Sequence, residues 1–187
     1  FQNGVARHSG VLAVGGDHIS NDISLGLRIP LTRAEKLKVE EGSTKLGAGT
    51  PGEMITLKND AGFSGKEVER EMLNIIIHAR VRENFELIKK QIQQEIPAHA
   101  LGAGVMLTGG CSLLRGIKEV AESVFDLPVH LARDSDVSGP KSVLNNPQYS
   151  TAIGLIKFAQ AIRAEEEEPS LIGSVLQKLG GMFRRRN

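Results

Sequence analysis

The sequence has 187 residues, of which 40% are hydrophobic and 24% are charged, enough for one domain or two small lobes. Its 23 basic residues nearly cancel its 22 acidic ones, and aromatic residues make up only 4% with no Trp, which argues against a nucleic-acid-binding surface. Cys111 is the only cysteine, which excludes a disulfide within the sequence and a zinc site built from several cysteines.

The first thirty residues are expected to form a strand followed by a helix. Asn3-Gly4 is a common two-residue hairpin turn, which predicts a strand over Val5 to Val14 that pairs with a preceding strand ending at Phe1-Gln2. After Gly15-Gly16, apolar residues recur at helical spacing and predict a helix. These residues are Ile19, Ile23 and Leu27.

Two capping-box patterns predict helix starts further along the chain. Thr32 to Glu35 would begin a short helix that ends at Gly42, and Ser64 to Glu67 would begin a long amphipathic helix that ends near Ile96, before a proline. The Gly-rich stretch between these helices contains one predicted strand, Met54 to Leu57.

The second half alternates strands and helices. A strand over Val105 to Thr108 is followed by one apolar helix face, a strand over Pro128 to Ala132, an irregular polar stretch over 133–149 and a core helix over Thr151 to Ile162. The helix face comprises Leu113, Leu114, Ile117, Val120, Ala121, Val124 and Phe125. The pattern predicts the α/β class, with a mixed sheet because the N-terminal strand pair is a hairpin.

The diglycine Gly109-Gly110 is the most informative local feature. It follows the buried strand and leads into the predicted helix, and without a Cβ atom its backbone can lie against a flat ligand near unpaired N–H groups. The alternative is a strand-to-helix turn that merely requires positive φ. By spacing alone, the two interpretations are about equal.

Glu35 and Lys38 form a second candidate site. Their i, i+3 spacing places a carboxylate and an ammonium on one helix face, where a ribose hydroxyl and an adenine edge could lie between them. The alternative is that Glu35 completes the capping box while Lys38 is solvated. Three other patterns are better explained structurally: the Gly47–Gly52 dinucleotide-like motif as a loop, Asp17, His18 and Asp22 as capping and surface residues, and Cys111 as a small side chain in a turn.

The C-terminal segment 170–187 has an apolar stripe and only positive charge, as expected of a helix that lies in an anionic membrane interface. Its two glycines lower its helix propensity, so the segment is expected to be unstructured until it binds. A helix in a partner's groove and an ordinary docked helix are the alternatives. The expected membrane-binding residues are Leu171, Ile172, Val175, Leu176, Lys178, Leu179, Met182, Phe183, Arg184, Arg185 and Arg186.

Four segments together resemble a known family. Residues 14–23 (VGGDHISNDI), 34–38 (AEKLK), 107–116 (LTGGCSLLRG) and 149–155 (YSTAIGL), followed by the basic amphipathic tail, are similar to the C-terminal half of FtsA, the family of actin-like bacterial cell-division proteins. The diglycine element is common to actin-like ATPases, and the tail separates FtsA from MreB, whose membrane helix usually lies at the other end.

The resemblance implies an α/β, actin-like architecture. Residues 1–31 and 101–163 would form the ribonuclease-H-like subdomain 2A, with its first strand missing, and residues 32–100 the inserted subdomain 2B. An acidic linker over 164–169 would then lead to the membrane-targeting helix at 170–187.

The resemblance also implies a nucleotide site for ATP with Mg²⁺. Gly16 would lie near the phosphates, Glu35 and Lys38 would grip ribose and adenine, Gly109 and Gly110 would back the adenosine, and Leu113 would flank the base. The phosphate loop typical of the family would precede Phe1, so this chain alone is expected to bind ATP weakly or not at all. The complete protein would be at most a weak ATPase.

The implied partners are FtsZ, through subdomain 2B, further copies of the protein in filaments, other divisome proteins and the anionic membrane. The complete protein would be peripheral on the cytoplasmic face of the bacterial inner membrane at the division site, and it would not bind nucleic acid. Two alternatives remain: a sugar-kinase-type enzyme of the same superfold, in which an aspartate base activates a substrate hydroxyl, and a membrane-binding adaptor with a degenerate cleft.

Overall fold

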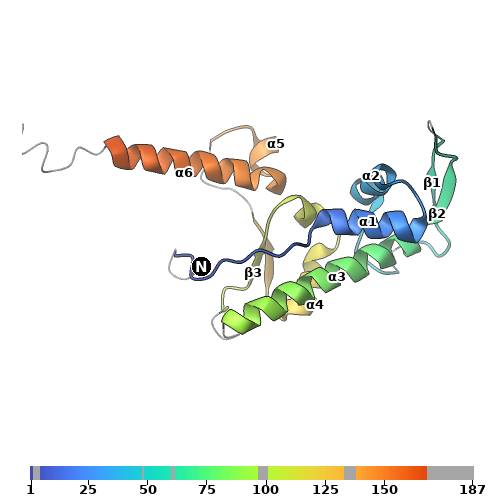
Figure 1. Ribbon diagram of the computed structural model, residues 1–187, viewed down its shortest axis with the longest axis horizontal. Coiled ribbons are helices and arrows are strands. Elements are labelled where there is room, and N and C mark those ends of the chain that lie inside the picture. Colours follow the sequence, from blue (N-terminus) through green and yellow to red (C-terminus); the bar gives the residue numbers. More distant parts are fainter. Residues whose placement is uncertain (2–4, 48, 60–61, 97–100, 133–137, 168–187) are drawn as a thin grey trace, which may run out of the picture. The chain divides into compact units, whose positions relative to one another are not determined.

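The computed structural model describes residues 1, 5–47, 49–59, 62–96, 101–132 and 138–167 (Figure 1). The chain divides into two units, Phe1–Arg133 and Asp134–Asn187, and each is described by itself. No helix among the described residues is long and apolar enough to cross a membrane.

The first two helices are α1, Gly16–Leu27, and α2, Leu31–Glu41. The predicted helix after the glycines is confirmed, and the side chains of Ile19, Ile23 and Leu27 are buried. The capping box expected at Thr32 is wrong, because α2 begins one residue earlier and Pro30 occupies the N-cap position that the pattern assigns to Thr32. Gly42 follows the last residue of α2, as predicted.

A β-hairpin and a long helix follow. Strand β1, Met54–Leu57, is confirmed, and it pairs antiparallel with β2, Lys66–Glu69. The second predicted capping box is therefore wrong, because Lys66 and Glu67 pair with Leu57 and Thr56 in this hairpin instead of opening a helix. Helix α3, Arg70–Glu95, starts only after β2, and it ends next to Ile96, as predicted.

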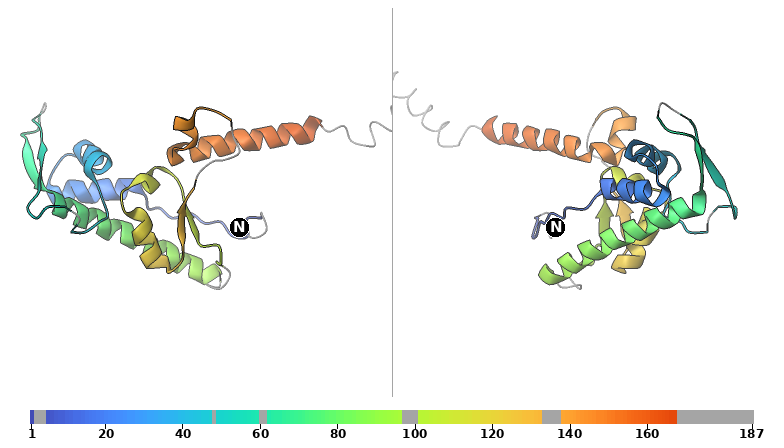
Figure 2. Two further views of the ribbon diagram at one scale, coloured as in Figure 1. Left: turned by 180° about the vertical axis from the view of Figure 1, so that it is seen from behind. Right: turned by 45° about the vertical axis from the view of Figure 1, so that its right-hand side comes forward.

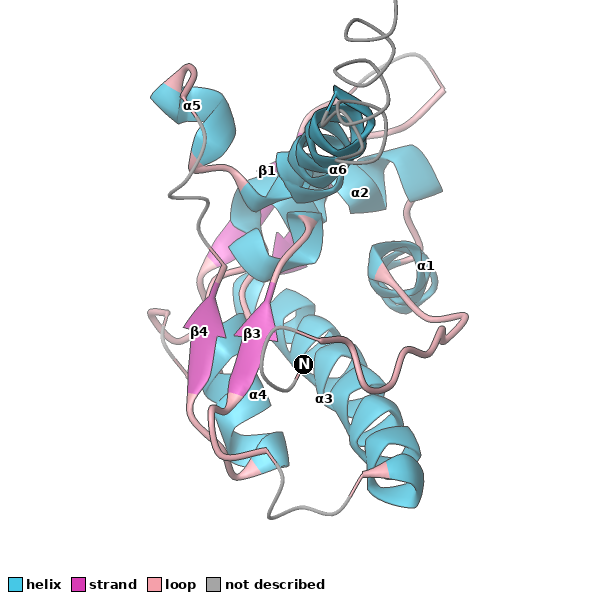
Figure 3. Ribbon diagram, turned by 90° about the vertical axis from the view of Figure 1, so that its left-hand side faces the viewer, coloured by secondary structure: helices cyan, strands magenta, loops and turns pink. Residues whose placement is uncertain are grey.

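The diglycine lies between a strand and a single helical turn. Strand β3, Val105–Leu107, precedes a 3₁₀ turn, Gly110–Leu113, and helix α4, Ile117–Phe125, begins after it. Strand β4, Val129–Leu131, pairs parallel with β3, and the two arrows point the same way in Figure 3. The single helix face predicted from Leu113 to Phe125 is therefore interrupted, because Gly116 adopts φ 81° immediately before α4.

The strand expected over Val5 to Val14 is not formed. Residues 6–14 have no regular secondary structure, and Val11 remains 93% exposed. The described residues form two separate two-stranded sheets, antiparallel β1–β2 and parallel β3–β4, instead of the predicted mixed sheet. A strand is stabilised by a neighbour that accepts and donates ladder hydrogen bonds, and no described segment pairs with 6–14.

The core of the first unit lies along α3. Helix α1 packs beside α3 in both views of Figure 2, and α4 contacts α3 as well. The side chains of Leu73 and Ile77 are fully buried, and the rings of Phe85 and Phe125 meet edge to face at 5.6 Å between centroids. Asp22 of α1 and Arg80 of α3 form an ion pair that ties these helices together at the surface.

Within its described residues, 138–167, the second unit has three helical elements. Helix α5, Lys141–Leu144, and a 3₁₀ turn, Pro147–Tyr149, occupy part of the stretch predicted to be irregular. Helix α6, Ser150–Glu167, confirms the last predicted helix, and its backbone continues into the acidic linker expected at 164–169. Glutamates have good helix propensity, so the charge run does not end the helix. The expected membrane-targeting segment 170–187 lies outside the described residues.

Candidate functional site

Three segments far apart in sequence meet at the start of α1. A Cβ atom added to Gly16 would lie 2.8 Å from the Cys111 sulfur and 3.4 Å from Lys38 Nζ. Gly16 is therefore surrounded by α2 on one side and by the turn after the diglycine on the other. The structure thus brings Gly16 and Lys38, two residues that the resemblance implies for the nucleotide site, close to the turn that follows the diglycine.

Lys38 is the centre of a hydrogen-bond network. The lysine is only 9% exposed, and its Nζ donates to the Gly16 carbonyl at 3.1 Å, to Ser20 Oγ at 2.8 Å and to Glu35 Oε2 at 2.6 Å. The Ser20 hydroxyl also donates to Glu35 Oε2. The alternative in which Lys38 is solvated and Glu35 completes a capping box is therefore wrong. The i, i+3 spacing on one helix face is confirmed as an ion pair.

Glu35 is held as a carboxylate. Burial raises its pKa, but the hydrogen bonds from Lys38 and Ser20 and the charge of Lys38 together outweigh burial and hold the pKa of Glu35 below its ordinary value of 4.5. Its side chain is 48% exposed, so the charged group is also accessible from outside the network. Glu35 can therefore accept a hydrogen bond from a ligand hydroxyl at neutral pH.

The diglycine turn has open space in front of Gly109. Gly109 adopts φ 83°, and a Cβ atom built on it would have no neighbour within 4 Å. Ser112 closes the turn, since its backbone N–H and its hydroxyl donate to the Gly109 carbonyl at 3.1 Å and 2.7 Å. Gly110 is exposed, and Leu113 at the end of the turn is 51% exposed. The positive φ that the turn interpretation requires is confirmed at Gly109, and the space in front of Gly109 is open. The ligand interpretation of the diglycine stays a prediction.

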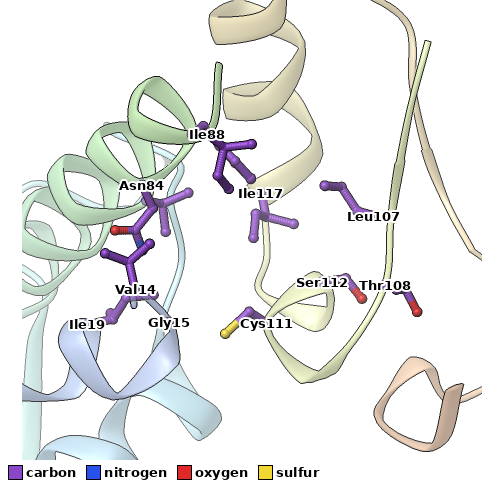
Figure 4. A pocket seen from close by; sticks show the side chains of 12 residues that line it. Val14, Gly15, Ile19, Asn84, Ile88, Leu107, Thr108, Cys111, Ser112 and Ile117 are labelled. Atoms are coloured by element: carbon purple, nitrogen blue, oxygen red, sulfur yellow. The ribbon is translucent and has the colours of Figure 1, made fainter. Parts of the chain in front are cut away.

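A cavity of about 310 Å³ adjoins this turn. Figure 4 shows the Cys111 sulfur directed toward the segment that leads into α1, with side chains of α3 along another wall. Most of the lining is apolar, and Asn84 Oδ1 is buried there without a hydrogen-bond partner among the described residues. The lining residues are Val14, Gly15, Ile19, Val81, Asn84, Phe85, Ile88, Leu107, Thr108, Cys111, Ser112 and Ile117.

Two of the three residues considered as metal ligands, His18 and Asp22, have structural partners. His18 Nδ1 accepts from the Gly15 N–H at 3.3 Å and so caps α1, and Asp22 pairs with Arg80. No group of three or more His, Cys, Asp or Glu side chains gathers within the described ranges. The described residues of the Gly47–Gly52 motif, which exclude residue 48, lie in turns and bends before β1 and open no helix, as expected of a loop.

Ser20 is the functional candidate that the sequence analysis missed. It lies one helical turn after Gly16 and is 2% exposed. A signal was present, because a serine stands on the face of α1 that otherwise buries Ile23 and Leu27. A polar residue at a buried helical position needs a partner, and here the partners come from α2, which local pattern alone does not reveal.

Comparison with known protein families is decisive. The family model described as "Cell division protein FtsA" matches residues 1–154. The chain belongs to the FtsA family. FtsA of Neisseria meningitidis serogroup B is 35% identical over 182 residues, which are 97% of this chain, and FtsA of Pseudomonas aeruginosa is 31% identical over 93% of it. The chain spans only 44% and 42% of these two relatives.

Solved structures confirm the α/β, actin-like fold of this FtsA-family chain. MreB5 of Spiroplasma citri bound to AMPPNP matches with a TM-score of 0.64 at 18% identity, covering 83% of this chain and 46% of that one. The same protein bound to ADP matches with a TM-score of 0.63 at 21% identity, covering 84% and 47%. The resemblance to FtsA and the predicted fold class are both confirmed.

Proposed function

We propose that this chain supplies one wall of an adenine-nucleotide cleft in an actin-like cell-division protein. Glu35 binds the ribose hydroxyls and Lys38 lies at the adenine. Gly109 and Gly110 form the backbone surface against which the adenosine packs. Gly16 lies near the phosphates, and Leu113 flanks the base.

One observation carries this proposal: Gly16, Lys38 and Cys111 converge, although they come from the start of α1, from α2 and from the turn after β3. The accessible carboxylate of Glu35 suits the hydroxyls of a sugar. The diglycine backbone, which has no side chains, suits a flat base, and the start of α1 suits an anion. The MreB5 structures of the same fold were obtained with AMPPNP and with ADP, which supports a nucleotide as the ligand.

The residues present fit the nucleoside better than they fit a metal ion. The space in front of Gly109 is unfilled, whereas the described residues offer no cluster of three metal-ligating side chains. Mg²⁺ is usually held mainly by substrate phosphates and water with one or two carboxylates, so it would enter with the phosphates of ATP. When bound, ATP with Mg²⁺ supplies a phosphoryl group for hydrolysis.

We further propose that the complete protein assembles into filaments, binds FtsZ through residues 32–100, associates with other divisome proteins and attaches to the inner membrane through residues 170–187. Membership of the FtsA family supports the role in cell division, and the apolar and cationic pattern of the tail supports attachment to an anionic surface. The protein would then act at the cytoplasmic face of the membrane at the division site.

Calorimetric titration of ATP into the protein at its natural length tests the nucleotide proposal. Gly110→Val should abolish binding, because its side chain fills the surface against which the adenosine lies. Gly102→Val is the matched control, since a Cβ atom there has no neighbour within 4 Å. Unchanged ATP affinity in Gly110→Val would refute the cleft, as would micromolar affinity in residues 1–187 alone, because that affinity would leave no role for the other wall.

A further inference from the structure

The buried hydroxyl group of Ser20 lies within hydrogen-bond distance of three polar groups near the candidate cleft. Its Oγ receives a hydrogen bond from Lys38 Nζ at 2.8 Å, contacts Glu35 Oε2 and lies 3.2 Å from the Gly16 carbonyl. The residue is 2% exposed. A serine that only satisfied its own helix would bond to the carbonyl four residues earlier and would not need partners from α2.

The number of donor protons on Lys38 and Ser20 shows how the Ser20 hydroxyl helps to hold Glu35. An ammonium group has three N–H donors, and Lys38 Nζ has three acceptors within hydrogen-bond distance: the Gly16 carbonyl, Ser20 Oγ and Glu35 Oε2. Lys38 is therefore saturated in this structure. Ser20 Oγ accepts from Lys38, and its single proton has two acceptors within hydrogen-bond distance, Glu35 Oε2 and the Gly16 carbonyl at 3.2 Å. The carboxylate is the stronger acceptor because it is charged, so it takes the Ser20 proton in preference to the carbonyl.

Glu35 is consequently fixed through one oxygen only. Both Lys38 and Ser20 reach Oε2, and among the described residues no hydrogen bond reaches Oε1. A carboxylate anchored from two helices through one oxygen presents the other in a defined direction. Without the Ser20 hydroxyl, only Lys38, three residues away on the same helix, would hold it.

We propose that Ser20 is a positioning residue of the nucleotide site, which orients the Glu35 carboxylate so that its second oxygen can accept from the ligand's ribose hydroxyls. The inference rests on the proposed nucleotide-binding function and adds to it a residue of α1 that holds Glu35 of α2. Ser20 itself does not contact the nucleotide. Ser20 affects the preference for a ribose over a sugar without the two hydroxyls more than it affects the fold.

The test compares Ser20→Ala with Ser24→Ala in the protein at its natural length. Ser24 lies one turn further along α1 and donates only to the Ile29 carbonyl, at 2.7 Å, so it is a matched control for the loss of a hydroxyl from the same helix. The dissociation constants of ATP and of 2′,3′-dideoxy-ATP, which lacks the ribose hydroxyls, are measured for the wild type and both variants by calorimetry.

The wild type should bind ATP more tightly than the dideoxy analogue. Ser20→Ala should raise the dissociation constant of ATP about tenfold, as expected for the loss of a hydrogen bond to a charged group. The dissociation constant of the dideoxy analogue should stay nearly unchanged. Ser24→Ala should change neither. Equal weakening of both ligands by Ser20→Ala would mean a merely structural role, and unchanged ATP affinity would mean no role. Either result overturns the inference.

A second measurement separates this inference from the proposed function. Carbon-13 NMR of the Glu35 carboxyl group requires no nucleotide. Ser20→Ala should raise its pKa, because one of the two hydrogen bonds that favour the charged form is lost, whereas Ser24→Ala should not. If the wild type binds no ATP, the proposed function fails, whatever the titration shows. If the pKa of Glu35 is the same in Ser20→Ala as in the wild type, Ser20 does not hold the carboxylate, and the inference fails.

Discussion

Lys38 Nζ donates a hydrogen bond to the carbonyl of Gly16 at 3.1 Å, which joins α2 to the first residue of α1 across 22 positions of the sequence. Lysine is rarely buried without charged or polar partners, because removing an ammonium group from water is costly. Here the three acceptors compensate for that cost and fix the side chain next to the diglycine turn. The same contacts that stabilise the two helices therefore arrange the candidate cleft.

Lys38→Met should destabilise the first unit. The substitution keeps most of the apolar side chain but leaves Ser20 and Glu35 without their shared donor, so we expect a loss of about 1–3 kcal/mol in the free energy of unfolding. Urea denaturation followed by circular dichroism measures it. Lys36→Met is the control, because Lys36 makes only an exposed pair with Glu40 at 3.9 Å and should change stability by less than about 0.5 kcal/mol. Equal effects of the two substitutions would show that the network contributes nothing.

The contribution of Glu35 should depend on pH in a predictable direction. Because its pKa is lowered from 4.5 in the folded protein, the stability it provides is fully present above that value and is lost as the pH falls through the folded pKa. The difference in unfolding free energy between wild type and Glu35→Gln should therefore be constant near neutral pH and shrink in acid. Taking the difference between the two proteins cancels the contribution of other acidic groups to the pH dependence of stability. Glu119 is one such group, since its pKa is also lowered. A difference that grows toward acid would contradict the network.

Gly104→Ala should be strongly destabilising. Gly104 adopts φ 82° directly before β3, and a Cβ atom there would lie 2.2 Å from the Pro128 carbonyl oxygen, which accepts the first β3–β4 hydrogen bond from Val105. The expected loss exceeds about 3 kcal/mol, because the backbone itself must move. Gly102→Ala should be nearly neutral, since it meets open space. A thermal unfolding midpoint for Gly104→Ala equal to that of Gly102→Ala would disprove the geometry of this turn.

Local periodicity was sufficient to predict several elements. Helix α1, strands β1 and β4 and the end of α3 lie where their apolar spacing and flanking breakers indicate, because each is set by nearby residues. The second capping box failed for a different reason. Ser64 to Glu67 satisfies the sequence pattern, but pairing of β2 with β1 provides hydrogen bonds that a helix start would forgo. Strand pairing across the intervening residues overrode the local preference.

The candidate site was predicted unevenly for a similar reason. The spacing of Glu35 and Lys38 on one helix is a local property, and it is confirmed. Ser20 was missed because its role depends on α1 packing against α2, which is a contact between helices. The strand expected over 5–14 shows the same limit, since the turn signal at Asn3-Gly4 cannot supply a partner strand.

The tail should bind anionic vesicles. The apolar stripe would insert and the cluster of Lys178 and Arg184 to Arg186 would attract acidic headgroups, so binding should weaken as salt increases. Phe183→Glu should release the protein at any salt concentration, whereas Ala at the three arginines should mainly lower the affinity for acidic lipid. Liposome co-sedimentation tests this. Equal pelleting of protein with and without residues 170–187 would place the attachment elsewhere.

In the proposed nucleotide cleft, Glu35, Lys38 and the diglycine lie along one wall. A crystal structure of the protein at its natural length with a non-hydrolysable ATP analogue would show whether the nucleotide contacts them. We expect the ribose hydroxyls within hydrogen-bond distance of the Glu35 carboxylate and the adenosine packed against the backbone of Gly109 and Gly110. A bound nucleotide that contacts neither Glu35 nor the diglycine would contradict the account.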